Sequence, residues 1–310
     1  METPVVLIIF KRPNTTKQVF EAIRKVQPRQ LYIIADGPRA DKVGETELCA
    51  ETRAVVEQVD WECEVHKNYA ETNMGLRERV ASGLSWVFEQ VEDAIILEDD
   101  CVPDPTFFQF CQDCLYTYRY DKRIMVVCGT NLLEEWKADT QSYCFSYHSH
   151  CWGWATWRRA WQYYDPDMRL WGNSEIKDRI RDVVCDRKIF ETYEQQFDSV
   201  YSNKINSWAL RWSCARLSQS GLAIIPSRNL ISNIGFDENA TNTSSKFDSR
   251  FGISTYSIAF PLKHPLCIAR DKGYETTCMH RHNGFNKTLL GRILRKTRWV
   301  FKSLSIKLSL

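Results

Sequence analysis

The chain has 310 residues, of which 26% are charged and 44% hydrophobic, and its formal net charge is +2. This composition is typical of a soluble globular protein that buries a sizeable core, as one large α/β domain or two small ones. We find no apolar run that would cross a bilayer and no basic-then-apolar signal peptide. The charge is uneven, because the segment from Asn283 onward carries seven Lys or Arg and no Asp or Glu.

The twelve cysteines are scattered, and several fall within predicted strands or helices. We interpret them as reduced, mostly buried thiols of a cytosolic protein. Cys278, His280 and His282 form a tight cluster that is compatible with a metal site, but a polar loop is the simpler interpretation.

Apolar periodicity predicts alternating strands and helices over the first 130 residues. The run from Val5 to Phe10 is apolar throughout, as in a strand that is covered on both faces. Val19, Ala22, Ile23 and Val26 then have helical spacing. Further strands are predicted at 31–35, at 63–67, around 95–97 and at 124–128, with helices between them. This alternation predicts a parallel sheet with helical crossovers.

Three consecutive carboxylates, Glu98, Asp99 and Asp100, follow the fourth predicted strand. Asp104 and Pro105 then have the pattern of a helix start. Open α/β sheets bind ligands at the carboxyl ends of their strands, and adjacent carboxylates repel each other unless a cation offsets the repulsion. The stretch therefore predicts a Mg²⁺ or Mn²⁺ site that a substrate phosphate completes. A solvated acidic loop is the alternative.

Other strand ends place charged residues at the same edge of the predicted sheet. Arg12 follows the first strand, and Asp36 and Arg39 follow the second. Arg77 and Arg79 begin a helix, where backbone donors favour an anion. Each Arg alone fits a solvated surface charge, but together they indicate a cleft for a nucleoside diphosphate. The sequence lacks a Walker-type loop and a Gly-x-Gly-x-x-Gly motif, which disfavours P-loop enzymes and dinucleotide dehydrogenases.

After Asn131 the sequence becomes rich in aromatic residues. Four Trp fall within ten residues, at positions 152, 154, 157 and 161, and Trp208 and Trp212 share one face of a later predicted helix. Aromatic rings stack on sugars, but they equally fill cores, and we expect most of these to be core. A helical region is predicted at 174–200, a strand at 222–226, and a polar loop over the cleft at 229–243.

These features together resemble the GT-A-fold sugar-nucleotide glycosyltransferases, in particular a bacterial family-2-like branch that is distantly similar to animal N-acetylglucosaminyltransferase I. The segments that carry the resemblance are 4–12, 35–39, 73–75, 95–108, 152–161, 207–212 and 229–243. It implies an α/β, GT-A (Rossmann-like) fold with a mostly parallel central sheet flanked by helices, with a nucleotide-sugar half at 1–130 and an acceptor half at 131–265. A C-terminal extension at 266–310 with a basic amphipathic helix is expected from the residues of that segment themselves.

The resemblance and the strand ends imply roles for individual residues. Asp100 is the expected direct ligand of Mn²⁺ or Mg²⁺, with Asp99 near the metal or the ribose. Asp36 matches a position that meets the nucleotide base, and Arg12 one that contacts the diphosphate. The expected nucleotide-sugar site comprises Phe10, Arg12, Asp36, Gly37, Arg39, Asn73, Gly75, Arg77, Arg79, Glu98 and Asp99. The expected acceptor site comprises Trp152, Gly153, Trp154 and Trp208.

The expected reaction moves a sugar from a UDP- or GDP-sugar to a hydroxyl of a glycan or lipid-linked acceptor, with inversion, in bacterial surface polysaccharide or glycolipid synthesis. A carboxylate should deprotonate the acceptor, and Asp237, Glu238 and Asp198 are the candidates. Relatives often carry Asp and His where this chain has Asn239 and Asn242, so the identity of the base stays open.

Two other functions stay open. A sugar nucleotidyltransferase also uses acidic metal ligands on an α/β sheet, but it usually has a Gly-rich loop where this chain has Lys11-Arg12-Pro13. A non-catalytic carbohydrate- or nucleotide-binding protein would explain the two Asn departures.

The last predicted element is a basic amphipathic helix. Its apolar side comprises Leu290, Ile293, Leu294, Val300, Phe301, Leu304 and Leu308, and its basic side comprises Arg292, Arg295, Lys296 and Lys302. Such a helix lies in an anionic membrane surface or docks on the protein's own core. We favour the membrane, and thus expect a cytoplasmic protein at the inner face of the membrane, with no nucleic-acid partner.

Overall fold

The computed structural model of the chain describes residues 1–235 and 253–282. The chain divides into two compact units, Met1–Asp271 and Lys272–Leu310. Within the described part of the second unit, helix α9 (Lys272–His282) contains Cys278 and His280. The polar loop predicted there is therefore wrong, because these residues continue one helix. The predicted amphipathic helix at 290–308 lies outside the described residues.

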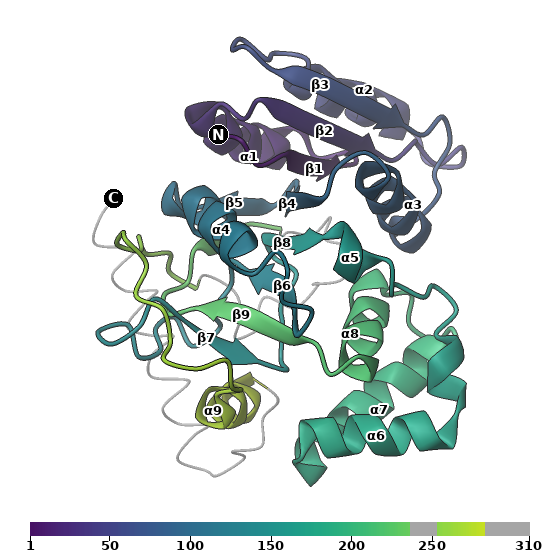
Figure 1. The fold of residues 1–310 in the computed structure, drawn as a ribbon. Helices are drawn as coiled ribbons and strands as arrows, with labels where there is room; N and C mark the ends of the chain where they lie inside the picture. Colours follow the sequence, from purple (N-terminus) through teal and green to yellow (C-terminus); the bar gives the residue numbers. More distant parts are fainter. Residues whose placement is uncertain (236–252, 283–310) are drawn as a thin grey trace, which may run out of the picture. The chain divides into compact units, whose positions relative to one another are not determined.

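An eight-stranded sheet runs through the first unit (Figure 1). Its strands are β1 (Val5–Ile9), β2 (Gln30–Ala35), β3 (Glu64–Tyr69), β4 (Asp93–Glu98), β6 (Ile124–Cys128), β7 (Tyr143–Ser146), β8 (Trp154–Trp157) and β9 (Leu222–Pro226). They are ordered β3-β2-β1-β4-β8-β6-β9-β7. β7 and β8 run antiparallel to the other six. The predicted α/β class with a mostly parallel central sheet is confirmed.

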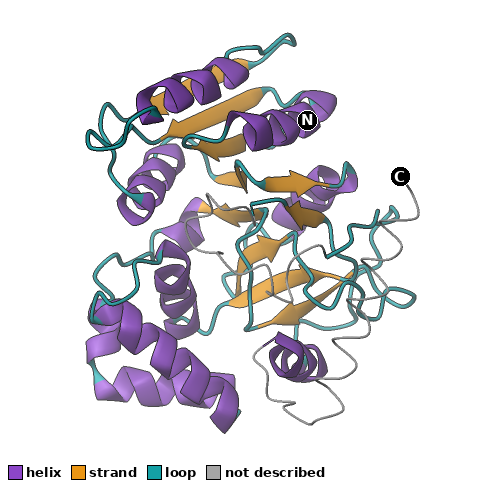
Figure 2. Cartoon of the chain, turned by 180° about the vertical axis from the view of Figure 1, so that it is seen from behind, coloured by secondary structure: helices purple, strands orange, loops and turns teal. Residues whose placement is uncertain are grey.

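Helices cover both faces of this sheet, which explains why its central strands are apolar throughout. On one face lie α1 (Pro13–Val26), α2 (Glu45–Val56) and α4 (Thr106–Thr117), whose buried side chains join one hydrophobic cluster with β1, β2 and β4. On the other lie α3 (Leu76–Phe88), α5 (Arg158–Trp161) and α8 (Trp208–Ser218). Figure 1 shows these three as a column beside the sheet, and Figure 2 shows the same layers from behind.

Helix α1 illustrates how the sequence specifies these elements. Pro13 stands at its first turn, where the missing N–H costs nothing. Thr16, Val19, Phe20 and Ile23 are buried at spacings of three and four, as an amphipathic helix on a sheet requires. The helix predicted from this spacing is confirmed.

The region predicted as helical at 174–200 forms two helices, α6 (Ser174–Val184) and α7 (Arg187–Tyr201), after the short 3₁₀ helix η1 (Arg169–Gly172). Side chains cap both: Asn173 accepts from Glu175 N, and Asp186 accepts from Ile189 N. The break between them falls at Cys185, whose backbone is left-handed with a φ of 51°.

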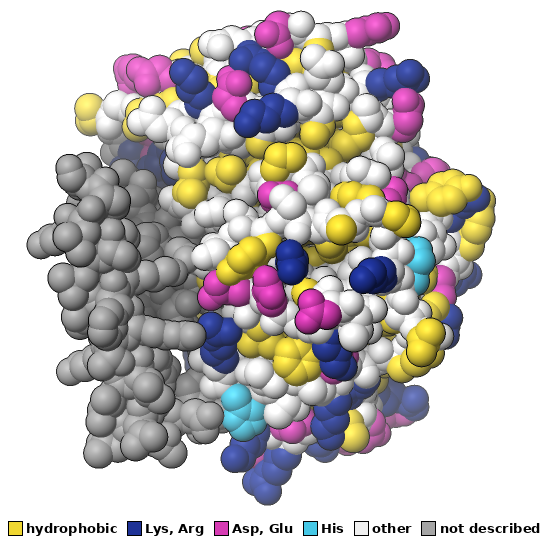
Figure 3. Space-filling view, turned by 90° about the vertical axis from the view of Figure 1, so that its left-hand side faces the viewer, with side chains coloured by type: hydrophobic (Ala, Val, Ile, Leu, Met, Phe, Trp, Pro, Cys, Tyr) yellow, Lys and Arg dark blue, Asp and Glu magenta, His cyan; other side chains and the backbone are white. Residues whose placement is uncertain are grey.

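On the face drawn in Figure 3, acidic, basic and apolar side chains of the described residues are interspersed. This mixture agrees with the small net charge of +2. Within the described residues, every helix is too short or too polar to cross a bilayer.

Candidate functional site

Glu98, Asp99 and Asp100 lie at the carboxyl end of β4, inside the sheet between β1 and β8. Glu98 pairs in register with Ile8 of β1, Asp99 is buried, and the other two carboxylates are half-buried. A short strand, β5 (Cys101–Pro103), follows at once. The predicted strand end is confirmed, and it places the three carboxylates at the edge where open α/β sheets meet their ligands.

Arg12 supplies positive charge to this acidic cluster from the connection between β1 and α1. Its guanidinium donates hydrogen bonds to Asp99 and to Asp100, the latter at 2.9 Å. Burial alone would lower the pKa of Arg12, but the two carboxylates raise it above its usual value. We call Glu98, Asp99, Asp100 and Arg12 the acidic edge. Three carboxyl groups share one guanidinium here, so carboxyl groups outnumber the cation that pairs with them.

The acidic edge fits a divalent cation. Burial and the negative charges of Asp100 and Asp99 raise the pKa of Glu98 to about 8. Burial also raises the pKa of Asp99 to about 6, although Arg12 opposes this shift. Carboxyl groups in this situation are stabilised in their charged form by a further cation. Carboxylate oxygens are the ligands that Mg²⁺ and Mn²⁺ prefer, and one such ion would favour the charged form of the three carboxyl groups.

Gly235 packs directly against the acidic edge. Strand β10 (Ile231–Asn233) pairs antiparallel with β5, and Ile234 N then donates to Asp100 O at 2.9 Å. A Cβ at Gly235 would overlap Asp100 Oδ2 and would lie 2.9 Å from Arg12 Nη1. A side chain at this position would therefore displace the carboxylate that we expect to bind the metal. Sequence reasoning placed 229–243 in one loop and missed β10, because a three-residue strand has too little periodicity to detect.

Asp36 holds the loop before α3. Its Oδ1 accepts hydrogen bonds from Gly37 N and Met74 N, both at 2.9 Å. Its Oδ2 accepts from Asn73 Nδ2 at 3.0 Å and from Gly75 N at 3.1 Å. A carboxylate offers about four lone-pair sites, so protein donors already use them. The predicted contact of Asp36 with a nucleotide base stays a prediction, and the structure adds a supporting role that the sequence did not indicate.

A buried carboxylate fixes two cations beside Phe10. Glu45 Oε1 accepts from Lys11 Nζ at 2.7 Å and from Arg39 Nη2 at 2.5 Å, and only 3% of its side chain is exposed. Lys11 and Arg39 both lie over the Phe10 ring, 5.4 and 5.9 Å from its centroid. Phe10 and Arg39 belong to the nucleotide-sugar site that we expected from the sequence, whereas Lys11 and Glu45 do not. Their pairing links two strand ends that are distant in sequence, which no local pattern reports.

The two arginines at the start of α3 have different surroundings. Arg79 is buried and donates to the backbone oxygens of Ala35 and Asn68, so its guanidinium ties α3 to the ends of β2 and β3. Arg77 is half-buried and forms an ion pair with Glu78 at 2.6 Å. Of the two, only Arg77 could reach an anion without breaking a buried network.

Most of the tryptophans belong to the core, as expected. Trp154 stacks on Trp208 with ring centroids 5.6 Å apart, and Trp161 packs on Trp212 at 5.3 Å. All four are buried. Trp152 is half-buried, and it is therefore the most accessible member of the predicted acceptor set.

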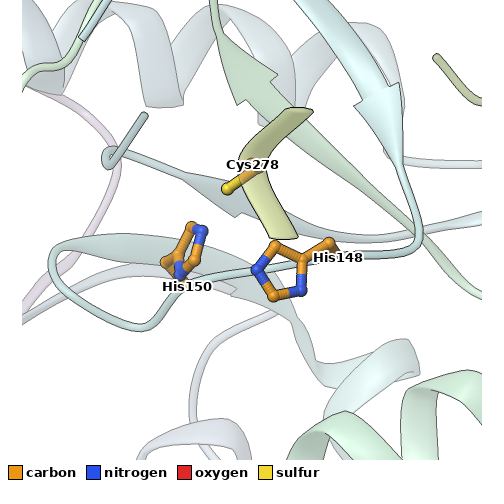
Figure 4. A group of neighbouring side chains, drawn as sticks. All are labelled: His148, His150 and Cys278. Atoms are coloured by element: carbon orange, nitrogen blue, oxygen red, sulfur yellow. The ribbon is translucent and has the colours of Figure 1, made fainter. Parts of the chain in front are cut away.

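The segment before β8 carries two neighbouring histidines. The rings of His148 and His150 lie 4.6 Å apart and nearly perpendicular (Figure 4). His148 Nδ1 is 2.7 Å from the hydroxyl of Tyr193 on α7, which fixes its ring. Cys278, also drawn in Figure 4, belongs to the second unit.

The candidate bases are only partly described. Asp198 lies on α7, where its carboxylate accepts from Trp171 Nε1 at 2.8 Å and from Lys177 Nζ at 2.9 Å. Burial would raise the pKa of Asp198, but these hydrogen bonds lower it below its usual value. Asp237 and Glu238 lie outside the described residues.

No protein-family model matches this sequence, and no curated protein matches it either. Solved structures that are similar to part of this chain include a mannosyltransferase from Pyrobaculum calidifontis in complex with GDP-Man and Mn2+, with 14% identity and a TM-score of 0.32 over 50% of this chain and 45% of that one. A cytidylyltransferase from Leptospira borgpetersenii has 11% identity and a TM-score of 0.33 over 52% and 63% of the two chains. An apo UDP-glucose pyrophosphorylase has 6% identity and a TM-score of 0.33 over 74% and 93%. This chain thus spans less than two thirds of the first two. At these scores the likenesses do not bear on the reaction.

Proposed function

We propose that the protein is a metal-dependent glycosyltransferase that moves a sugar from a nucleotide-sugar to an acceptor hydroxyl, with inversion. The observation that carries this proposal is the acidic edge: Glu98, Asp99 and Asp100 follow one another at the end of β4, and Arg12 pairs with two of them. A nucleotide-sugar bound with Mg²⁺ or Mn²⁺ matches this edge, because the cation binds carboxylates and diphosphate together.

In this proposal each residue of the acidic edge has a distinct task. Asp100, aided by Asp99, would hold the cation, which supplies Lewis-acid stabilisation of the departing diphosphate when bound. Arg12 would exchange some of its hydrogen bonds to these carboxylates for hydrogen bonds to the diphosphate. There its positive charge would offset the negative charge that develops on the diphosphate as it leaves. The bond between the sugar C1 and the phosphate oxygen breaks, and the bond between C1 and the acceptor oxygen forms.

The acceptor hydroxyl must lose its proton to a carboxylate. Asp237 and Glu238 follow Gly235, which lies against Asp100, and we propose one of them as the base. Asp198 is the weaker candidate because Lys177 and Trp171 already use its carboxylate. Alanine substitution of each, with nucleotide binding as the control, would identify the base as the residue whose loss stops transfer while leaving donor affinity intact.

The short connection between β1 and α1 supports a glycosyltransferase over a sugar nucleotidyltransferase. It consists of Phe10, Lys11 and Arg12 only, because β1 ends at Ile9 and α1 begins at Pro13. A nucleotidyltransferase usually wraps a triphosphate in a longer Gly-rich loop here, and three residues leave little backbone for that purpose.

The deciding assay offers the full chain UDP- and GDP-sugars with Mn²⁺ and a mixture of glycan acceptors, and in parallel nucleoside triphosphates with sugar phosphates. Release of nucleoside diphosphate together with a new glycoside supports the transferase. Release of pyrophosphate would instead indicate the nucleotidyltransferase, and donor binding without any product would indicate a non-catalytic binding protein.

We further propose that the basic tail brings the protein to an anionic membrane that carries a lipid-linked acceptor. Sedimentation with vesicles of anionic and of neutral lipids tests this for the full chain and for a truncation at Asn283. Equal sedimentation of both proteins would contradict the proposal.

A further inference from the structure

A cavity of about 200 Å³ lies between the sheet and α8, beside the segment that enters β8. Trp152, Trp154 and Trp212 form its aromatic walls, and Ser149, His150 and Ser213 contribute polar atoms. We call it the tryptophan cavity. An enclosed space of about 150 Å³ is already enough for a benzene molecule, so this one has room for a single six-membered ring.

Two buried indole N–H groups at the tryptophan cavity have no hydrogen-bond partner among the described residues, those of Trp154 and Trp212. Their side chains are 1% and 3% exposed. An indole N–H can only donate, and buried donors without partners are rare. Both rings border the cavity, but their Nε1 atoms have almost no accessible surface, so a ligand in the cavity would accept from them only after a small movement of the rings.

Other buried indoles of the same fold are paired. Trp157 donates to Leu115 O at 3.2 Å, and Trp161 donates to Ser85 Oγ at 3.1 Å. Neither ring lines the tryptophan cavity. Among the described residues, the indole nitrogens that are both unpaired and almost without accessible surface are those of Trp154 and Trp212, and both rings line the cavity.

The lining also limits the chemistry of a ligand. It contains no Asp, Glu, Lys or Arg, and its apolar part comes from Val126, Ala209 and Leu210 besides the indole rings. A charged ligand would thus lose its hydration with no Asp, Glu, Lys or Arg among the described lining residues to pair with, and His150 is the one of them that could carry a positive charge. A sugar ring fits better, because its C–H faces pack on aromatic rings while its oxygens accept from N–H groups.

The tryptophan cavity adjoins the acidic edge. Trp154 pairs in register with Ile96 of β4. A Cβ at Gly153 would overlap Ile231 and would lie 3.4 Å from Leu97 Cδ2, just before Glu98. Burial, and then the charge of Glu98, raises the pKa of the Cys151 thiol, which also lines the cavity. A ring held here would lie beside the place where the donor sugar is expected.

We propose that the tryptophan cavity binds one uncharged monosaccharide ring of the acceptor, held by the N–H groups of Trp154 and Trp212. This inference rests on the proposed function and narrows it, since it names the acceptor as a neutral glycan and excludes uronic and sialic acids at this position. It adds Trp212, His150 and Ser213 to the expected acceptor residues.

The test uses methyl glycosides of glucose, galactose, mannose and N-acetylglucosamine, with methyl glucuronide as the charged counterpart. Binding to the full chain is measured by saturation-transfer NMR, alone and with Mn²⁺ and UDP or GDP. We expect at least one neutral glycoside to bind and the glucuronide to bind at least tenfold more weakly. Binding of no neutral glycoside under either condition, or equal binding of the glucuronide, overturns the inference. Nucleotide binding in the same samples reports separately on the proposed function.

Variants test whether the glycosides bind in the tryptophan cavity. Trp212→Phe removes one N–H and keeps an aromatic ring, and it should weaken glycoside binding about fivefold, the effect of one neutral hydrogen bond. Trp157→Phe is the matched control, because it removes a buried indole N–H outside the tryptophan cavity and should leave glycoside affinity unchanged. Leu210→Trp fills the cavity and should abolish binding. Denaturant unfolding establishes that each variant is folded, and wild-type glycoside affinity in both folded cavity variants would overturn the assignment.

Discussion

The acidic edge and the tryptophan cavity are neighbours in one fold, but they differ in the kind of group that lacks a partner. At the acidic edge, three carboxylates share one guanidinium, so the site lacks positive charge. In the cavity no Asp, Glu, Lys or Arg is present, and what is missing is an acceptor for two neutral donors. The comparison leads us to expect a different ligand at each site: a cation with a diphosphate at the acidic edge, and an uncharged, oxygen-rich ring in the tryptophan cavity.

The largest expected effect comes from Asp100→Asn, which keeps the shape of the side chain but removes its charge. We expect transfer to fall by at least about a hundredfold, because the cation loses its direct ligand and the diphosphate its counter-charge. Asp60→Asn removes a carboxylate from an exposed ion pair with Arg24 and serves as the control. Initial rates at saturating Mn²⁺ measure both. A rate within threefold of wild type for Asp100→Asn would contradict the metal site.

Gly235→Ala should also disturb the acidic edge, here by steric overlap rather than by loss of charge. Its Cβ would overlap Asp100 Oδ2 and displace the carboxylate, so we expect metal-dependent nucleotide affinity to fall about tenfold, as for changes that misplace a metal ligand. In Gly172→Ala the new Cβ meets only the hydroxyl of Tyr201 at 2.7 Å, the far end of a side chain. Calorimetric titration should show an effect for the first variant and none for the second.

Ionic strength should separate the two sites without any mutation. Between about 0.05 and 0.5 M NaCl the screening length falls severalfold, so we expect nucleotide affinity at the acidic edge to fall severalfold. Glycoside affinity at the tryptophan cavity should stay constant, because the ligand is neutral and no Asp, Glu, Lys or Arg of the described residues lines the cavity. A common salt dependence of both affinities would show that the two sites do not differ in the way described.

The smallest effect concerns Glu45, which forms ion pairs with Lys11 and Arg39 where we expect the nucleotide. Hydrogen bonds from Arg39, then Lys11, lower the pKa of Glu45 to about 2 although burial opposes them. A lowered carboxyl pKa stabilises the folded state fully above the unfolded value of about 4.3, and this contribution disappears as the pH falls towards 2. The free energy of unfolding should therefore fall less steeply for Glu45→Gln than for wild type between pH 5 and 3.

Urea unfolding at pH 7, 5, 4 and 3 measures this difference. Parallel pH dependences of the two proteins would show that the ion pairs of Glu45 do not contribute. Glycoside affinity should be the same in both proteins at pH 7, since Glu45 does not line the tryptophan cavity.

The sequence predicted the parallel part of the fold and the acidic edge because both depend on local patterns. Strand β1 is an unbroken apolar run, and Glu98, Asp99 and Asp100 are consecutive, so their common position at a strand end needs no tertiary information. Strands β7 and β8 were missed, since four residues each offer little periodicity and their pairing is antiparallel.

The residues that support the site could not be predicted, because they act across long sequence separations. Glu45 joins two strand ends, Gly235 reaches Asp100 through β10, and Trp212 meets Trp154 only after α8 packs on the sheet. Arg79 shows the opposite case: its place at a helix start suggested an anion site, but backbone carbonyls bind its guanidinium. Only tertiary contacts distinguish such a supporting arginine from one that binds a ligand.

The central claim is that the acidic edge binds a nucleoside diphosphate through a divalent cation. Calorimetric titration of UDP, GDP and their sugars into wild type and Asp100→Asn, with Mn²⁺ and with chelator, tests it most directly. The account predicts that one nucleotide binds wild type in the presence of Mn²⁺, and that chelator or the substitution removes this binding. Absence of nucleotide binding to wild type with either Mn²⁺ or Mg²⁺ would contradict it.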